Sequence, residues 1–220
     1  EIGAGVRIGP WCSVGPDAVL EDGVELVSHV VVDGHARIGA GTRIFPFATV
    51  GLPPQDLKYK GEPTRVEIGP NCLIREHVTI HRGTPGGGGL TRIGAGCMLM
   101  CVAHIAHDCV LEDRCIIANN VMFGGHIHVG EQVFIGGGSA IHQFVRIGRH
   151  AAVGGMSGVE GDVISHERRD EEIAVVVTGL HAELPCLPAR HHRLRQRFRH
   201  QLVKERILRP LVDQHRSVEI

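Results

Sequence analysis

Aromatic residues are scarce in this chain, whose 220 residues include one Trp, one Tyr and six Phe. A core built from such a composition must be mainly aliphatic. Glycine is instead abundant, with 30 residues, and each glycine inside a helix costs about 1 kcal/mol relative to alanine. These two features argue against a helical bundle and favour a backbone that turns often.

Long apolar runs are also missing, since no stretch approaches the roughly 20 residues of a membrane span. No basic-then-apolar signal segment opens the chain. We therefore expect a cytoplasmic protein without stable membrane insertion. The net charge of −1, from 23 basic and 24 acidic residues, predicts no general affinity for nucleic acid. Positive charge is concentrated only in residues 190–209.

What the chain does have is an aliphatic residue at every sixth position, in three runs separated by two interruptions. The positions are Ile2, Ile8, Val14, Leu20, Leu26, Val32, Ile38, Ile44 and Val50, then Ile68, Ile74 and Ile80, then Ile93, Leu99, Ile105, Leu111, Ile117, Phe123, Val129, Ile135, Ile141, Ile147, Val153 and Val159. A short fixed period over some 160 residues is typical of a β-solenoid, whose repeats bury their apolar faces by stacking.

These hexads resemble the repeat of the left-handed parallel β-helix acyltransferases, in which three hexads form one triangular coil of 18 residues. The resemblance predicts an all-β chain: a left-handed parallel β-helix, or hexapeptide-repeat solenoid, over residues 1–164. Residues 165–220 form an atypical tail. Within it, Arg190 to Leu208 has the apolar stripe of an amphipathic helix, so we expect a short C-terminal helical segment.

The two interruptions predict loops that leave the stack at residues 51–67 and 81–92, and such loops often carry function. The first holds the only tyrosine, Tyr59. The second holds four consecutive glycines, Gly86 to Gly89, for which simple flexibility is the favoured interpretation.

Five of the seven cysteines lie four places after a repeat aliphatic residue, where a small buried side chain is wanted; they are Cys12, Cys72, Cys97, Cys109 and Cys115. No Cys-x-x-Cys pair occurs, so neither a disulfide framework nor a thiolate zinc site is expected.

Titratable groups are densest from Cys101 to Cys109, and the hexad register predicts their direction. His104, His107 and Asp108 all occupy positions that face away from the solenoid core. Residues 18 apart stack at the roughly 4.8 Å inter-strand spacing, which places Gly125 and then Gln143 over His107, and His126 over Asp108. A histidine beside a glycine N–H suits a general base next to an oxyanion donor, as in acyl transfer to a hydroxyl.

Six longer stretches resemble the acyl-carrier-protein:UDP-N-acetylglucosamine O-acyltransferase family of lipid A biosynthesis. They are Gln55 to Tyr59, Gly61 to Arg65, Ile80 to Thr84, Ala103 to Cys109, Ala118 to Asn120 and His142 to Phe144.

The resemblance implies transfer of a 3-hydroxyacyl chain from the phosphopantetheine of acyl carrier protein to the sugar 3-hydroxyl, without a metal or other cofactor. It implies that His107 is the general base, aided by Asp108, and that the Gly125 N–H binds the oxyanion. It implies a homotrimer with active sites between subunits. The substrate-binding residues that it implies are Gln55, Asp56, Lys58, His81, His104, His126, His142, Gln143 and Gly155, the last limiting acyl-chain length.

The tail departs from this pattern. Family members carry a Gly-Leu-Lys-Arg-Arg motif that contacts the nucleotide, whereas Gly179-Leu180 is here followed by His181-Ala182-Glu183. The altered tail leaves an inactive homologue as one alternative. Two others stay open on the shared solenoid, a related N-acyltransferase of the same pathway and a metalloenzyme resembling the γ-class carbonic anhydrases with His104, His107 and His126 as ligands.

Overall fold

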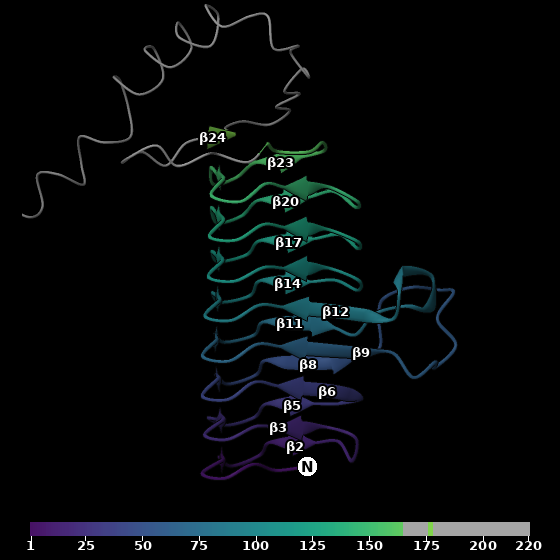
Figure 1. Ribbon diagram of the computed structural model, residues 1–220, viewed down its shortest axis with the longest axis vertical. Helices are drawn as coiled ribbons and strands as arrows, with labels where there is room; N and C mark the ends of the chain where they lie inside the picture. Colours follow the sequence, from purple (N-terminus) through teal and green to yellow (C-terminus); the bar gives the residue numbers. More distant parts are fainter. Residues whose placement is uncertain (165–175, 178–220) are drawn as a thin grey trace, which may run out of the picture. The chain divides into compact units, whose positions relative to one another are not determined.

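The computed structural model describes residues 1–164 and 176–177, and Figure 1 shows them as a column of stacked coils. Most strands are only two residues long and end on the aliphatic residue of a hexad. The chain returns to the same face after three hexads, so that Arg7 pairs with Glu25 and Ile8 with Leu26 in parallel register. The predicted left-handed parallel β-helix is confirmed.

Three parallel sheets form the faces of the solenoid. Every third strand joins the same sheet, except the last, β24 (Val176–Val177), which pairs with β22 (Ala152–Val153). The nine-stranded sheet contains β1 (Arg7–Ile8), β4 (Glu25–Leu26), β7 (Arg43–Ile44), β10 (Leu73–Ile74), β13 (Met98–Leu99), β16 (Ile116–Ile117), β19 (Phe134–Ile135), β22 (Ala152–Val153) and β24 (Val176–Val177). The eight-stranded sheet contains β2 (Ser13–Val14), β5 (Val31–Val32), β8 (Thr49–Leu52), β11 (Thr79–His81), β14 (His104–Ile105), β17 (Met122–Phe123), β20 (Ala140–Ile141) and β23 (Gly158–Val159). The seven-stranded sheet contains β3 (Val19–Leu20), β6 (His35–Ile38), β9 (Arg65–Ile68), β12 (Leu90–Ile93), β15 (Val110–Leu111), β18 (His128–Val129) and β21 (Arg146–Ile147).

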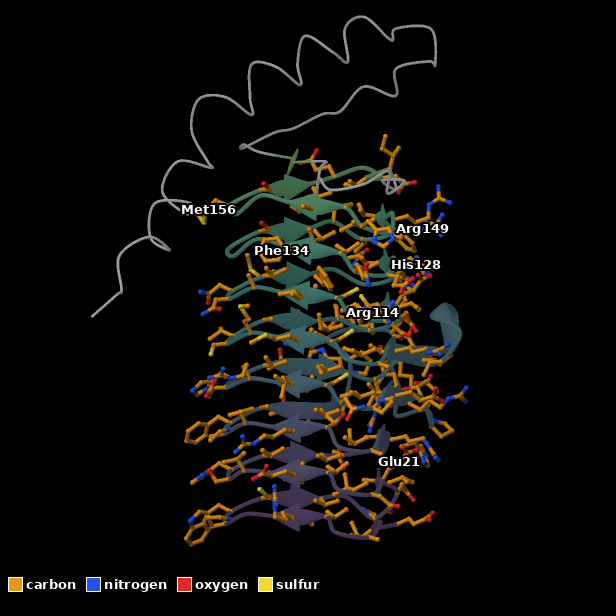
Figure 2. The ribbon with its side chains drawn as sticks, turned by 60° about the vertical axis from the view of Figure 1, so that its left-hand side comes forward. Glu21, Arg114, His128, Phe134, Arg149 and Met156 are labelled. Carbon is orange, nitrogen blue, oxygen red and sulfur yellow. The ribbon has the colours of Figure 1, made fainter. Side chains whose placement is uncertain are left out.

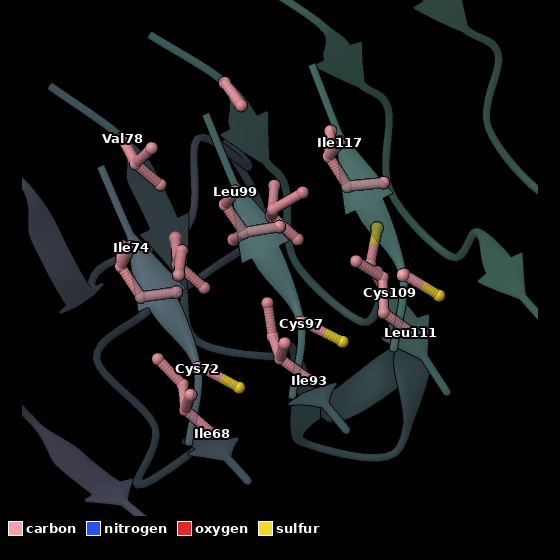
Figure 3. Packing of buried hydrophobic residues seen from close by; sticks show 14 of the residues in the cluster. Ile68, Cys72, Ile74, Val78, Ile93, Cys97, Leu99, Cys109, Leu111 and Ile117 are labelled. Atoms are coloured by element: carbon pink, nitrogen blue, oxygen red, sulfur yellow. The ribbon is translucent and has the colours of Figure 1, made fainter. Parts of the chain in front are cut away.

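The core consists of the hexad aliphatic residues stacked in register. Ile74, Leu99 and Ile117 lie one above another, as Figure 3 shows, and each is fully buried. Burying one such side chain contributes roughly 1.5–3 kcal/mol. Because side chains alternate along a strand, the residue before each aliphatic faces outward, as His128 and Phe134 do in Figure 2.

Four of the five cysteines assigned to packing are buried, namely Cys72, Cys97, Cys109 and Cys115. Cys12 is the exception. It is half-buried because it lies in the first coil, which has a neighbouring coil on one side only. Cys186 lies outside the described residues.

Both insertions leave the stack at one corner, between the eight-stranded and seven-stranded sheets (Figure 1). They are shorter than the sequence suggested. The first covers residues 53–64 and the second residues 82–89, which include a single 3-10 turn, η1 (Pro85–Gly87). The flanking strands extend further because Leu90 and Thr91 pair with Arg65 and Val66.

Beyond residue 164 the structure describes only β24, which pairs with β22 through Ala152 and Val176. The hexad pattern did not predict this strand. The helix expected from Arg190 to Leu208, and with it the C-terminal helical segment, lies outside the described residues. No helix within the described part of the chain is long and apolar enough to span a membrane.

Candidate functional site

Three successive turns at the corner that bears the insertions bring the candidate residues into one column. Asp108, His126 and Phe144, spaced 18 residues apart, all have positive φ, at 58°, 62° and 66°. The His107 and His126 rings meet edge to face with centroids 5.1 Å apart. The Phe144 ring stacks on His126 at 4.6 Å. The stacking predicted from the hexad register is therefore observed.

His107 and Asp108 point away from the solenoid core, as predicted, but they are not surface residues. Their relative exposures are only 9% and 6%. The second insertion packs on Asp108, whereas His126 and Gly125 of the next coil lie against the His107 ring. The contact of the insertion with Asp108 could not be seen from the hexad register. The interpretation of the four glycines as a merely flexible loop is therefore wrong. The N–H groups of Gly87 and Gly89 donate to Thr84 O, and Gly87 packs against Asp108.

Thr84, at the start of the second insertion, binds Asp108 twice. Its backbone N–H donates to Asp108 Oδ1 at 2.9 Å, and its hydroxyl donates to Oδ2 at 2.6 Å. From the strand that follows the insertion, the Thr91 hydroxyl accepts the Asp108 N–H at 2.8 Å. Both ends of the insertion therefore hold Asp108.

Asp108 Oδ2 lies 2.8 Å from His107 Nδ1. A carboxylate can only accept hydrogen bonds, so the proton of a neutral His107 ring resides on Nδ1 and leaves Nε2 with a free lone pair. A Cβ atom at Gly125 would lie 2.5 Å from His107 Cε1 and 2.9 Å from Nε2. Glycine at this position therefore leaves room beside the basic nitrogen.

The Gly125 turn also offers an available backbone donor. Gly124 N–H donates to Ile141 O at 2.9 Å, and His126 N–H donates to His107 O at 3.1 Å. No backbone carbonyl of the described residues accepts the N–H of Gly125. A free N–H close to an imidazole Nε2 is the pairing that acyl transfer requires.

His81 and His104 form a second ring pair one coil lower, with centroids 4.9 Å apart. Burial, reinforced by the neighbouring histidines, lowers the pKa of His81 to about 4. Burial likewise lowers the pKa of His104, whose Nδ1 lies 2.7 Å from the Thr79 hydroxyl. Both rings are therefore neutral near pH 7. His81 Nδ1 is buried and has no hydrogen-bond partner among the described residues.

The three candidates of the first insertion lie apart from this cluster. Gln55 and Lys58 are exposed, and Asp56 Oδ1 accepts only the local Lys58 N–H at 2.9 Å. The insertion is anchored by Arg82, whose Nε donates to the Tyr59 hydroxyl at 3.0 Å.

The remaining candidates lie above or beside the column. His142 is exposed, and its Nδ1 donates to Gln143 O at 3.2 Å. Gln143 packs over Gly124. Gly155 does not lie at this corner. It sits beside Gly137 and just before Met156, at the corner between the nine-stranded and eight-stranded sheets.

Cys109 lies next to Asp108 but turns into the core, as predicted. Its thiol donates to Gly124 O at 3.1 Å, and burial raises its pKa to about 12. It is therefore not a nucleophile at this site.

One group of potential metal ligands is found among the described residues, formed by His107, Asp108 and His126, with ligand atoms within 4.8 Å of one another. His104, which the carbonic-anhydrase hypothesis needs, is not part of it. Both Asp108 oxygens already accept hydrogen bonds from Thr84.

Sequence reasoning missed Thr84, Thr91 and Phe144. Phe144 lies 18 residues after His126, so the repeat arithmetic could have found it. Thr84 ends the family-like stretch from Ile80, but nothing in that stretch indicated a contact with Asp108, and Thr91 carried no signal.

Comparisons with known proteins agree with this architecture. The model of the family "Bacterial transferase hexapeptide (six repeats)" matches residues 90–125. An acyl-[acyl-carrier-protein]--UDP-N-acetylglucosamine O-acyltransferase of Rhizobium johnstonii is 50% identical over 165 residues, which are 75% of this chain and 61% of that protein. The chain thus spans about three fifths of this relative.

Solved structures show the same relationship. The UDP-N-acetylglucosamine O-acyltransferase (LpxA) of Moraxella catarrhalis is 47% identical, with a TM-score of 0.71 over 73% of this chain and 63% of that one. The LpxA of Acinetobacter baumannii is 46% identical, with a TM-score of 0.65 over 74% of this chain and 67% of that one. On this identity, and on a shared solenoid of hexapeptide repeats, the chain belongs to the UDP-N-acetylglucosamine O-acyltransferase family.

Proposed function

We propose that this chain transfers a 3-hydroxyacyl group from acyl carrier protein to the 3-hydroxyl of UDP-N-acetylglucosamine. The observation that carries the proposal is the free Nε2 of His107 beside the unpaired N–H of Gly125. The names of the relatives supply the substrate class.

The reaction follows from this geometry. His107 Nε2 takes the proton of the sugar hydroxyl as its oxygen attacks the thioester carbonyl carbon. The Gly125 N–H stabilises the oxyanion of the tetrahedral intermediate. When the intermediate collapses, the C–S bond breaks and the imidazolium returns its proton to the departing phosphopantetheine sulfur. Asp108 stabilises the imidazolium in between. No metal or other cofactor enters these steps.

The neutral rings of His81 and His104, together with His126, bind polar groups of the sugar and the acyl chain. His81 Nδ1 supports this role, because a buried polar atom without a partner costs roughly 1–3 kcal/mol until a ligand satisfies it. His142, Gln143 and Gly155 complete the substrate contacts along the upper coils, where Gly155 admits the end of the acyl chain.

Gln55, Asp56 and Lys58 serve a neighbouring subunit of a homotrimer in the cytoplasm. Their position supports this proposal, because they project from the corner of the site without contacting His107 of their own chain.

An assay of acyl transfer from acyl carrier protein to UDP-N-acetylglucosamine tests the function. His107→Ala should lower kcat about 10²–10⁴-fold, the usual contribution of a general base. His128→Ala is the matched control, since His128 is an exposed histidine on β18. Equal activity in wild type and His107→Ala would remove His107 as the base, and absence of transfer by the wild-type chain would refute the function.

A further inference from the structure

The second insertion has a second contact with Asp108 that is steric rather than polar. A Cβ atom added at Gly87 would overlap the Asp108 carboxyl carbon and both of its oxygens. Gly83 is also tight, since its Cβ would lie 2.8 Å from Asp108 Oδ1. The backbone of the insertion therefore packs directly on the carboxylate.

The Asp108 side chain is 1% exposed. Apart from the His107 ring and the more distant His126 Nδ1, at 3.9 Å, no ionisable group of the described residues forms an ion pair with it. The two Thr84 donors therefore supply most of its solvation. Removing them would leave a buried charge short of hydrogen bonds, which is costly.

The insertion is itself internally fixed. Thr84 O accepts hydrogen bonds from the N–H groups of Gly87 at 3.0 Å and Gly89 at 2.8 Å. Gly89 O accepts the Arg65 N–H at 2.9 Å, which ties the insertion to β9. Thr84 is thus held in place before it binds Asp108.

We propose that Thr84 and Gly87 are positioning residues of the acyl transfer, which act on His107 only through Asp108. Thr84 orients the carboxylate that selects the Nδ1-protonated form of His107. Gly87 leaves the space that this orientation needs. The proposal rests on the acyl transfer proposed above. It assigns a role to the glycine-rich insertion that is separate from substrate contact.

Neighbouring glycines of η1 provide a matched pair of variants. A Cβ at Gly86 would meet nothing within 4 Å, whereas one at Gly87 would overlap Asp108. Gly87→Ala should lower kcat about 10²-fold, the cost of an ångström-scale misplacement of a catalytic group. Gly86→Ala should leave kcat unchanged. In both variants KM should change less than two-fold, because Gly87 packs on Asp108 and Gly86 faces open space.

Variants of Thr84 test the hydrogen bonds that this residue donates to Asp108. Thr84→Val should lower kcat about 10-fold, as expected for the loss of one hydrogen bond to a buried charge. Thr84→Ser should restore at least half of the wild-type kcat. A merely structural role would instead change the thermal midpoint of all these variants in parallel with their activity.

A second readout does not depend on turnover. In ¹⁵N-histidine-labelled protein, the Nδ1–H proton of the His107–Asp108 hydrogen bond should give a downfield resonance that Asp108→Asn abolishes. Gly87→Ala and Thr84→Val should shift or broaden it, while Gly86→Ala leaves it unchanged. An unchanged resonance in Gly87→Ala would overturn the positioning role even if the wild-type chain transferred no acyl group. A shifted resonance without acyl transfer would overturn the function alone.

Discussion

The two insertions leave the solenoid at the same corner and from neighbouring coils, but they contact the rest of the chain differently. In the first, Tyr59 Oη donates to Glu62 O at 2.6 Å and accepts from Arg82 Nε of the second insertion, while Leu57 is 98% exposed. In the second, Thr84 is 5% exposed and bonds to Asp108, which lies 24 residues further along the chain.

The difference shows that two insertions at the same corner of a repeat fold can make different contacts. The second insertion folds back on its own chain and completes the surroundings of His107. The first presents Gln55, Asp56 and Lys58 outward, where they are available to another molecule. An insertion between hexads is therefore informative about function only once its direction is known.

The largest effect on kcat should come from changing Asp108, the residue that the second insertion contacts. Asp108→Asn keeps the shape but places a donor opposite His107 Nδ1–H or Thr84, which disfavours the Nδ1-protonated ring. We expect kcat to fall on the order of 10³-fold. The counterpart, Asp56→Asn in the first insertion, should alter KM rather than kcat. Steady-state kinetics measure both, and equal losses of kcat would contradict the distinction.

A smaller effect should appear in the pH dependence of stability at the base of the second insertion. The pKa of His81 is lowered to about 4 by burial, while an unfolded histidine titrates near 6.5. Between these values the unfolded chain binds more protons, so stability should fall as the pH drops from about 6.5 to about 4.

Urea unfolding at several pH values measures this loss. His81→Gln should flatten the curve in that window, although the lowered pKa of His104 will keep some slope. His128→Gln, at an exposed position, should not flatten it. An identical slope in wild type and His81→Gln would show that His81 is not held neutral.

The smallest effect concerns the anchor of the first insertion. Tyr59→Phe removes the hydroxyl that accepts from Arg82 Nε and donates to Glu62 O. The loss should cost about 0.5–1.5 kcal/mol of local stability. Amide hydrogen exchange should become faster within residues 53–64 while the Thr84 amide stays protected. Faster exchange in both insertions would show that they are one cooperative unit.

The hexad period predicted the strands, the core and the column of His107, Gly125 and His126, because in a solenoid one register determines the direction of every side chain. It also placed Cys109 in the core. It could not predict how the second insertion buries Asp108, since that contact depends on the conformation of a segment outside the repeat. The four glycines suggested flexibility, whereas Gly87 is required by its contact with Asp108.

The hexad arithmetic does not place the candidates of the first insertion, because residues 53–64 lie outside the repeat. The resemblance assigns Gln55, Asp56 and Lys58 to a site between subunits, and Gln55 and Lys58 are exposed in this chain. Gly155 does follow the repeat, two places after Val153, and it lies at a different corner from His107.

A double-mutant cycle between Thr84→Val and Asp108→Asn tests most directly whether the second insertion acts on His107 through Asp108. The kcat of acyl transfer would be measured for wild type, both single variants and the double variant. We predict that Thr84→Val lowers kcat about 10-fold in the wild-type background and has no further effect once Asp108 is Asn. Equal losses in both backgrounds would show that Thr84 acts independently of Asp108 and would contradict the account.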